Sequence, residues 1–422
     1  MQRLSAGAAA CARASLAPRR CTTPRSLCGL LARRCFTATS APLSSVHAAA
    51  AAAACSAGER AWTVPPRNRT VARWLYVSAA CVGGVVWFGG VTRLTESGLS
   101  LVEWKPISGV RPPLTQEEWE REFHHYQEFP EFKQKPDMTL AQFQFIFFWE
   151  WAHRVLARGL GVVFGGPLLY YTARGYFKGR GAVLAGLVGI LGLGGAQGFM
   201  GWYMVTSGLD MSLLEERRKA TVSAYRLAAH LILAFTIYAL MLRVGFGLTH
   251  PVMTRFPRFA TVQLWSRASF AMMFTTAMTG AFVAGLDAGL LYNDEFPWMA
   301  GGVFPPADHL ITVEPLWRNL FESHAMVQTV HRVMAGVTFL TIARLNVAAS
   351  RRRGFVPPPI LRSLMYVNTA LLFQVGLGFW TVMSSVDIPI AASHQMGALI
   401  LLTTLIRMCA VVGSRGIVLA PA

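Results

Sequence analysis

The chain alternates long apolar segments with shorter polar ones. Eight apolar segments reach the length of about 20 helical residues that a hydrocarbon core requires. Their limits are 72–93, 143–173, 181–205, 224–246, 266–287, 323–345, 361–384 and 390–413. Apolar residues make up 53% of the 422 residues and charged residues only 14%, a composition typical of multi-span membrane proteins. The pattern therefore predicts an all-α membrane protein with eight transmembrane helices.

Charge alternates along the connections between these segments. The connections after the second, fourth and sixth segments are basic, whereas the two long connections, 94–142 and 288–322, are rich in Asp and Glu. By the positive-inside rule, the basic connections and the N-terminus face the matrix or cytosol. The acidic connections then lie on the opposite side of the membrane.

The net charge of +18 is concentrated near the N-terminus. Residues 1–73 contain eleven Arg, no Lys and a single acid, Glu59. This distribution argues against nucleic-acid binding by the rest of the chain. An Arg-rich, Ser-rich, acid-poor leader over residues 1–70 is typical of an organelle transit peptide, with a disordered cytosolic tail as the alternative. Five of the seven Cys fall in this leader, so the chain shows no disulfide framework.

The two halves of the chain repeat each other. Glu96-Ser-Gly-Leu matches Asp287-Ala-Gly-Leu, Gln197-Gly-Phe-Met-Gly matches Gln374-Val-Gly-Leu-Gly, and His153-Arg matches His331-Arg. Because four segments separate the copies, both halves have the same orientation and form parallel repeats. We therefore predict two four-helix bundles, one in residues 71–250 and one in residues 251–422.

Four of the ten His fall inside the apolar segments, at similar depth in the two halves. His153 and His230 form one predicted pair, and His331 and His394 form the other. A single intramembrane His is most often a hydrogen-bonded packing residue, but a symmetric set of four is harder to explain in that way. Two opposed imidazoles without Cys or a second carboxylate suit axial ligation of haem iron better than a zinc site. The pattern favours a membrane protein that holds two haems.

The repeats differ three residues before the first His of each pair. Glu150 precedes His153, whereas Gln328 precedes His331. Electron transfer alone would not require a carboxylate at one site, and a carboxylate beside iron can accept a proton or stabilise a developing cation. We infer that the first bundle performs chemistry and the second holds a resident cofactor. The alternative is that Glu150 only accepts a hydrogen bond from Trp151, Arg154 or another neighbour.

Three arginines lie close to these histidines, and each has two readings. Arg154 and Arg332 directly follow His153 and His331, and Arg226 precedes His230 by one helical turn. Their guanidinium groups either pair with haem propionates or extend to the membrane surface as ordinary interface residues.

The ordered motifs resemble those of haem A synthases of the mitochondrial type. The resemblance covers approximately residues 72–413 and leaves only the leader outside. It is carried by Gly89-Gly-Val-Thr-Arg-Leu-Thr-Glu-Ser-Gly-Leu99, Glu117-Glu-Trp-Glu-Arg-Glu-Phe, Phe129-Pro-Glu-Phe132, Glu150-Trp-Ala-His-Arg154, Gly198-Phe-Met-Gly-Trp-Tyr-Met-Val205, Tyr225-Arg-Leu-Ala-Ala-His230, Gly280-Ala-Phe-Val-Ala-Gly-Leu-Asp-Ala-Gly-Leu290, His331-Arg332 and Ala392-Ser-His-Gln395.

This resemblance implies oxidation of the C8 methyl group of haem O to a formyl group, which gives the haem A of cytochrome c oxidase. It implies that His331 and His394 ligate a resident haem b, that His153 and His230 ligate the substrate haem, and that Glu150 is essential to turnover. Some bacterial relatives carry paired Cys in their outer loops. This chain lacks them, so a thiol redox step is not expected here.

The resemblance also implies partners and a location. The expected partners are haem O, the haem O synthase that precedes this step, a ferredoxin-type electron-transfer protein and membrane lipid, without nucleic acid. The expected location is the mitochondrial inner membrane, with the N-terminus in the matrix and the haem sites toward the intermembrane space. Whether the chain forms a homo-oligomer stays open. The rival functions are a dihaem electron-transfer protein and a haem assembly or transport factor that leaves the porphyrin unaltered.

Overall fold

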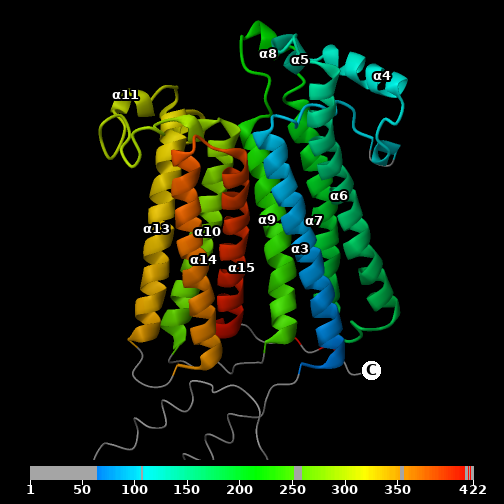
Figure 1. Ribbon diagram of the computed structural model, residues 1–422. Coiled ribbons are helices and arrows are strands. Elements are labelled where there is room, and N and C mark those ends of the chain that lie inside the picture. Colours follow the sequence, from blue (N-terminus) through cyan, green and yellow to red (C-terminus); the bar gives the residue numbers. More distant parts are fainter. Residues whose placement is uncertain are drawn as a thin grey trace, which may run out of the picture. The chain divides into compact units, whose positions relative to one another are not determined.

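The computed structural model describes residues 64–105, 108–250, 259–351 and 356–413, together with residues 417 and 419. The predicted leader, apart from residues 64–70, lies outside the described residues. Each apolar segment predicted from the sequence coincides with one long helix (Figure 1). These helices are α3 (Pro66–Leu94), α6 (Leu140–Ala173), α7 (Gly181–Thr206), α9 (Ala224–Thr249), α10 (Ala260–Gly285), α13 (His324–Ser350), α14 (Pro358–Met383) and α15 (Ile388–Gly413).

Seven of these helices are long and apolar enough to cross a membrane by length and composition, so the chain is an all-helical, multi-pass membrane protein. Helix α6 is not among the seven, although it is the longest of the set with 34 residues. It carries Glu150, His153, Arg154 and Arg158 in succession, and these polar side chains lower its mean hydropathy. The ionisable residues of α6, which are candidates for chemistry, are thus also the residues that lower its mean hydropathy.

Local sequence explains where several helices begin. The Thr139 hydroxyl accepts from the Gln142 amide, and the Gln142 side chain accepts from the Thr139 amide, which forms a capping box at the start of α6. The Ser323 hydroxyl caps α13 by accepting from the Met326 amide at 3.4 Å. Proline occupies the first position of α3 and of α14, where its missing N–H has no intrahelical partner to lose.

The connections between long helices carry short helical turns, and α4, α5, α8 and α11 lie at the same end of the long helices (Figure 1). We call this end the loop end. The short elements are η1 (Ser108–Val110), α4 (Gln116–Gln127), α5 (Pro130–Gln134), α8 (Ser212–Glu215), η3 (Ala288–Leu290), α11 (Ala307–Leu310), η4 (Leu316–Arg318) and α12 (Asn319–Glu322).

The long helices pack in two groups of four. Helix α3 contacts α6 and α9, and α7 contacts the same two helices. In the second group, α10 contacts α13 and α15, and so does α14. Helices α3 and α9 of the first group contact α15, and α9 also contacts α10, so that residues 63–422 form one compact unit. The predicted division of this unit at residues 250 and 251 stays a prediction.

Helices α3 and α15 approach closely near the end of α3 and the start of α15. The Gln395 side-chain amide donates to the Val86 carbonyl at 3.1 Å. A Cβ atom added to Gly90 would lie 1.6 Å from Oε1 of Gln395. Glycine at this position therefore makes room for a hydrogen bond that ties the two groups together.

A network of ion pairs joins the two groups at the loop end. Glu96 follows α3 and Asp287 follows α10, and both have a left-handed backbone with φ of 52°. Lys219 contacts both carboxylates, at 2.6 Å and 3.1 Å, and Arg93 contacts Asp287 at 2.8 Å. Burial alone would raise the pKa of Glu96, but hydrogen bonds from Lys135 and Lys219 outweigh it and lower that pKa to about 2. Glu96 is therefore ionised at physiological pH, and Lys219 links equivalent positions of the two repeats.

Candidate functional site

Each of the four predicted histidines lies against a glycine of the long helix that precedes its own. A Cβ atom added to that glycine would approach Cε1 of the imidazole to about 3 Å, closer than side-chain carbons normally come. Only glycine lets the ring lie so close to the neighbouring backbone. The pairs are Gly89 with His153 at 2.9 Å, Gly201 with His230 at 3.1 Å, Gly280 with His331 at 3.0 Å and Gly378 with His394 at 3.0 Å.

The ring nitrogens also have polar partners on that preceding helix. Nδ1 of His153 lies 3.1 Å from the Val85 carbonyl, and Nδ1 of His331 lies 2.9 Å from the Thr279 hydroxyl. That hydroxyl donates its own proton to the Thr276 carbonyl at 2.8 Å, so its oxygen is free to accept from the imidazole. When Nδ1–H is the donor, Nε2 keeps its lone pair for a metal.

The two histidines of each predicted pair stand on opposite helices of one group. Helices α6 and α9 both pack against α3 and α7, so they face each other across the first group; α13 and α15 do so across the second. His153 and His230 are close enough for the charge on one imidazole to influence the other, and the same is true of His331 and His394. The two imidazoles of each predicted pair therefore come from opposite helices, as the prediction of axial haem ligands expects.

The carboxylate of Glu150 is buried beside the first pair, with 5% of the residue exposed. Nε of Arg154 donates to its Oε1 at 2.5 Å. The terminal nitrogens of Arg154 donate to the carbonyls of Glu103 at 3.0 Å and Leu101 at 2.7 Å. Glu150 thus lies one turn from His153, and it also accepts the hydrogen bond from Arg154 that the structural alternative expects, so its chemical role stays a prediction. The contact with Arg154 is therefore made at a buried position, where electrostatic interactions are stronger than in water.

In the second pair, a glutamine occupies the position that corresponds to Glu150. Gln328, which is 3% exposed, turns its amide to the Leu291 carbonyl at 2.7 Å. Arg332 donates through Nη1 to the Pro297 carbonyl at 3.3 Å, while its Nε and Nη2 are buried without a partner among the described residues. Buried cationic donors left in this state are costly unless a ligand satisfies them. Arg154 binds Glu150 in the first repeat. Arg332, which occupies the equivalent position in the second repeat, therefore offers its donors to an anionic group.

The three predicted propionate partners differ in what they contact. Arg154 is engaged by Glu150 and two carbonyls, as described above. Arg226 lies over the Tyr203 ring at 3.7 Å and donates to the Tyr203 carbonyl at 2.7 Å. Only Arg332, of these three, has buried nitrogens without a protein partner. Its geometry therefore suits a propionate best.

Sequence reasoning missed the residues that surround the imidazoles. Gln197, Gln374 and Thr279 contact the rings, and the four glycines make room for them. A signal was available, because a Gln precedes a Gly by four residues in both α7 and α14 and the two copies were recognised as a repeat. The four glycines were not predicted to lie against the histidines. Spacing alone does not reveal that their partner is an imidazole.

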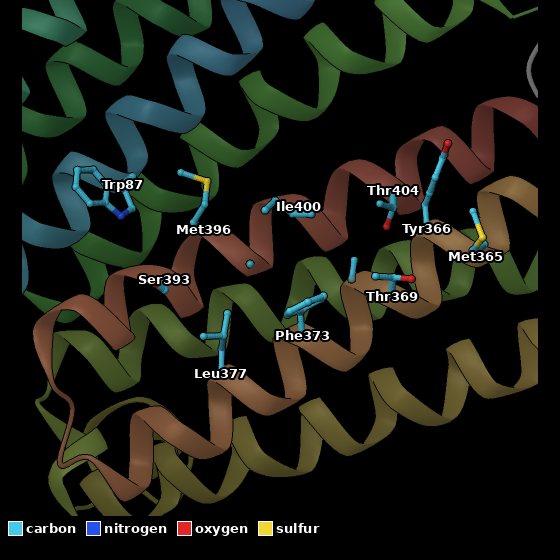
Figure 2. A pocket seen from close by; sticks show the side chains of 12 residues that line it. Trp87, Met365, Tyr366, Thr369, Phe373, Leu377, Ser393, Met396, Ile400 and Thr404 are labelled. Carbon is cyan, nitrogen blue, oxygen red and sulfur yellow. The ribbon is translucent and has the colours of Figure 1, made fainter.

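An apolar groove of about 670 Å³ lies beside the second pair, lined mainly by α14 and α15 (Figure 2). At one end Trp87 of α3 faces Met396 and Ser393, and at the other end lie Tyr366 and Thr404. Ser393 directly precedes His394. The groove therefore borders the site without containing its polar residues, and its apolar lining suits hydrocarbon.

Two half-buried histidine pairs on opposite helices, with an acid beside one pair, are features that suit a haem-binding, multi-pass helical membrane protein. The family described as cytochrome oxidase assembly protein, COX15-CtaA, matches residues 72–406. The Heme A synthase of Rhodospirillum centenum is 43% identical over 335 residues, which cover 79% of this chain and 86% of that protein. The human Heme A synthase COX15 is 43% identical over 345 residues, 80% of this chain and 81% of that protein. The chain belongs to this haem A synthase family.

A third relative carries an additional domain. The Heme A synthase-mitochondrial ferredoxin fusion protein of Schizosaccharomyces pombe is 38% identical over 368 residues, 80% of this chain and 59% of that protein. No solved structure matches the chain.

Proposed function

We propose that this protein is a haem A synthase that oxidises the C8 methyl group of haem O at the first histidine pair, beside Glu150, and holds haem b at the second pair. Haem A synthases convert haem O to haem A, the form that cytochrome c oxidase uses. The observation that carries the assignment of the two sites is the contrast between Glu150 and Gln328. An acid one turn from a ligand supplies what substrate oxidation needs and what a resident electron carrier does not.

The proposed architecture has eight transmembrane helices in two parallel repeats, with residues 71–250 as the substrate bundle and 251–422 as the haem b bundle. Helix α6 supplies the eighth span, because it packs between α3 and α7 and its polar residues belong to the site. Support for the repeat comes from the contact between a glycine and an imidazole, which occurs four times with the same geometry.

The described residues fit two haems. His153 and His230 would bind the iron of the substrate haem, and His331 and His394 would bind the iron of haem b. The buried, unpartnered nitrogens of Arg332 suit a haem b propionate, whereas Arg154 and Arg226 would approach a propionate only by exchanging present contacts. When bound, haem b supplies one-electron transfer.

Glu150 and its neighbours would assist the oxidation of the methyl group. The methyl carbon would be oxidised in two successive two-electron steps. Each step would consume one water, release two protons and pass two electrons, one at a time, by way of the haem b site to the oxidised form of the electron-transfer partner. The aldehyde hydrate formed in the second step would then lose water to give the formyl group. The Glu150 carboxylate stabilises positive charge that develops on the methyl carbon or accepts a proton from it. Arg154 holds the carboxylate in place, because its Nε donates to Oε1 while two loop carbonyls fix its other nitrogens.

The proposed location is the mitochondrial inner membrane, with the loop end and both haem sites toward the intermembrane space. Basic residues in the connection after α6 support this orientation, since Arg174, Lys178 and Arg180 lie at the opposite end of the helices. The proposed electron-transfer partner is a ferredoxin-type protein. The fusion of a ferredoxin to a relative in Schizosaccharomyces pombe supports this proposal.

Extraction of the bound pigments tests the function. We expect the purified protein to contain haem b and, after haem O and an electron-transfer partner are supplied, to yield the aldehyde-bearing haem A, detected by chromatography and mass. Two non-exchanging haems with no haem A would instead indicate a dihaem electron carrier. Release of unaltered haem O would indicate a transport or assembly factor.

Gly89→Ala tests the placement of the substrate haem. The new methyl group would lie 2.9 Å from Cε1 of His153, so we expect the ring to move and haem O affinity to fall about tenfold or more, equivalent to about 1.4 kcal/mol. Titration of haem O measures this change. Gly84→Ala is the matched control, because a Cβ at that position of α3 meets nothing within 4 Å. Equal affinities in the two variants would remove His153 from the site.

A further inference from the structure

Gln197 of α7 and Gln374 of α14 each contact the imidazole of the following long helix. Nε2 of Gln197 lies 3.2 Å from both ring nitrogens of His230. Nε2 of Gln374 lies 3.2 Å from Nδ1 and 3.5 Å from Nε2 of His394. Both glutamines precede by four residues the glycine that faces the same imidazole. The same contact therefore occurs twice, at equivalent positions of the two repeats.

These distances place the amide over the face of the ring. An atom nearly equidistant from Nδ1 and Nε2 lies either beyond Cε1 in the ring plane or above the ring. The Cε1 edge is already directed at Gly201 in one site and Gly378 in the other. The amide nitrogen therefore covers one face, in the manner of an N–H group directed at an aromatic ring. The ring edge that carries Nε2 is left open to iron.

Both glutamines are held in place. The Gln197 amide also donates to the His230 carbonyl at 3.1 Å, which fixes it to the backbone of α9. A Cβ atom added to Gly397 would lie 2.3 Å from Oε1 of Gln374, so the second amide occupies a closely packed position. Oε1 of each glutamine is buried without a protein partner. A buried polar group is retained at such a place when it serves the site.

The other two histidines are held differently. Their Nδ1 atoms meet acceptors near the ring edge, the Val85 carbonyl for His153 and the Thr279 hydroxyl for His331. Each haem would thus have one imidazole ligand that is held at the edge of its own ring and one imidazole ligand that is held across the face of its own ring. An imidazole can turn about its Cβ–Cγ bond, and an amide on its face opposes this rotation more directly than a single contact at one nitrogen.

We propose that Gln197 and Gln374 are positioning residues that set the ring planes of His230 and His394 relative to the porphyrins. This inference rests on the proposed ligation of haem by these histidines. The angle between axial imidazole planes determines how the iron d orbitals split, and partners of ligating histidines control ring orientation. The two glutamines therefore tune the electronic state of both irons without touching them.

Electron paramagnetic resonance of the full-length protein with bound haem b tests the proposal. Gln374→Met keeps the length of the side chain and removes the amide. We expect the variant to keep its haem b, while the low-spin ferric signal broadens or its g values shift and the midpoint potential changes. Leu372→Met is the matched control, because Leu372 is 69% exposed on the lipid side of the same helix, and its signal should equal that of the wild type.

The outcomes separate this inference from the proposed function. An unchanged signal and potential in Gln374→Met would overturn the role of the glutamine while leaving the ligands in place. A wild-type spectrum without the signature of two imidazole ligands would overturn the ligand assignment itself. If Gln374→Met loses haem b, reconstitution with excess haem b decides: a shifted signal supports the inference, and a wild-type signal contradicts it.

Discussion

Glu150→Gln is expected to abolish conversion of haem O to haem A while haem b stays bound. Glutamine has the shape of glutamate and still accepts a hydrogen bond from Arg154 through its amide oxygen, but it brings no negative charge to the substrate. General-base and charge stabilisation by one side chain typically contribute a factor of about 10² to 10⁴, so haem A formation should fall by at least about 10². The measurement is the ratio of haem A to haem O in extracted pigment.

Glu131→Gln provides the control for this experiment. Glu131 is as buried as Glu150, each with 5% of the residue exposed, but it lies in α5 at the loop end rather than beside a histidine pair. Its loss should leave the rate of haem A formation close to that of the wild type. Normal haem A formation in Glu150→Gln would show that the carboxylate has only a structural role.

His331→Ala is expected to remove the resident haem b. The substitution deletes one of two proposed iron ligands and leaves Arg332 without the haem propionate that would satisfy its buried donors. Loss of a contact that merely orients a ligand lowers metal affinity by about 10- to 100-fold, and loss of the ligand itself should cost no less. The haem b content per protein, measured from the reduced pyridine spectrum, should fall accordingly.

Added imidazole distinguishes a missing ligand from a misfolded protein. A small imidazole can enter the space left by the His331 side chain and should restore haem b binding. His309→Ala is a suitable control, because His309 lies in α11 at the loop end and contacts Tyr292 rather than a second histidine. Unchanged haem b content in His331→Ala would remove that residue from the ligand set.

The helices were readily predictable because an apolar segment of membrane length leaves few other structures open to the backbone. The eight segments coincide with eight long helices, although the start of α10 lies at Ala260 rather than residue 266. The short elements of the loop end were not predicted. Their course depends on contacts such as the ion pairs of Lys219 with Glu96 and Asp287, which join residues far apart in the sequence.

The candidate site was predictable only in its most polar residues. Glu150 and the four histidines stand out because ionisable groups are rare within apolar segments. Gln197 and Gln374 do not stand out in that way, because an amide in a membrane helix is a common packing residue. Their direction toward an imidazole follows from the crossing of two helices. No periodicity within one helix contains that information.

Gly89 and Gly90 are adjacent in α3 but serve different neighbours, since Gly89 faces His153 and Gly90 faces Gln395, the residue after His394. The backbone of α3 therefore separates a proposed ligand of the substrate haem from the residue that follows a proposed ligand of haem b.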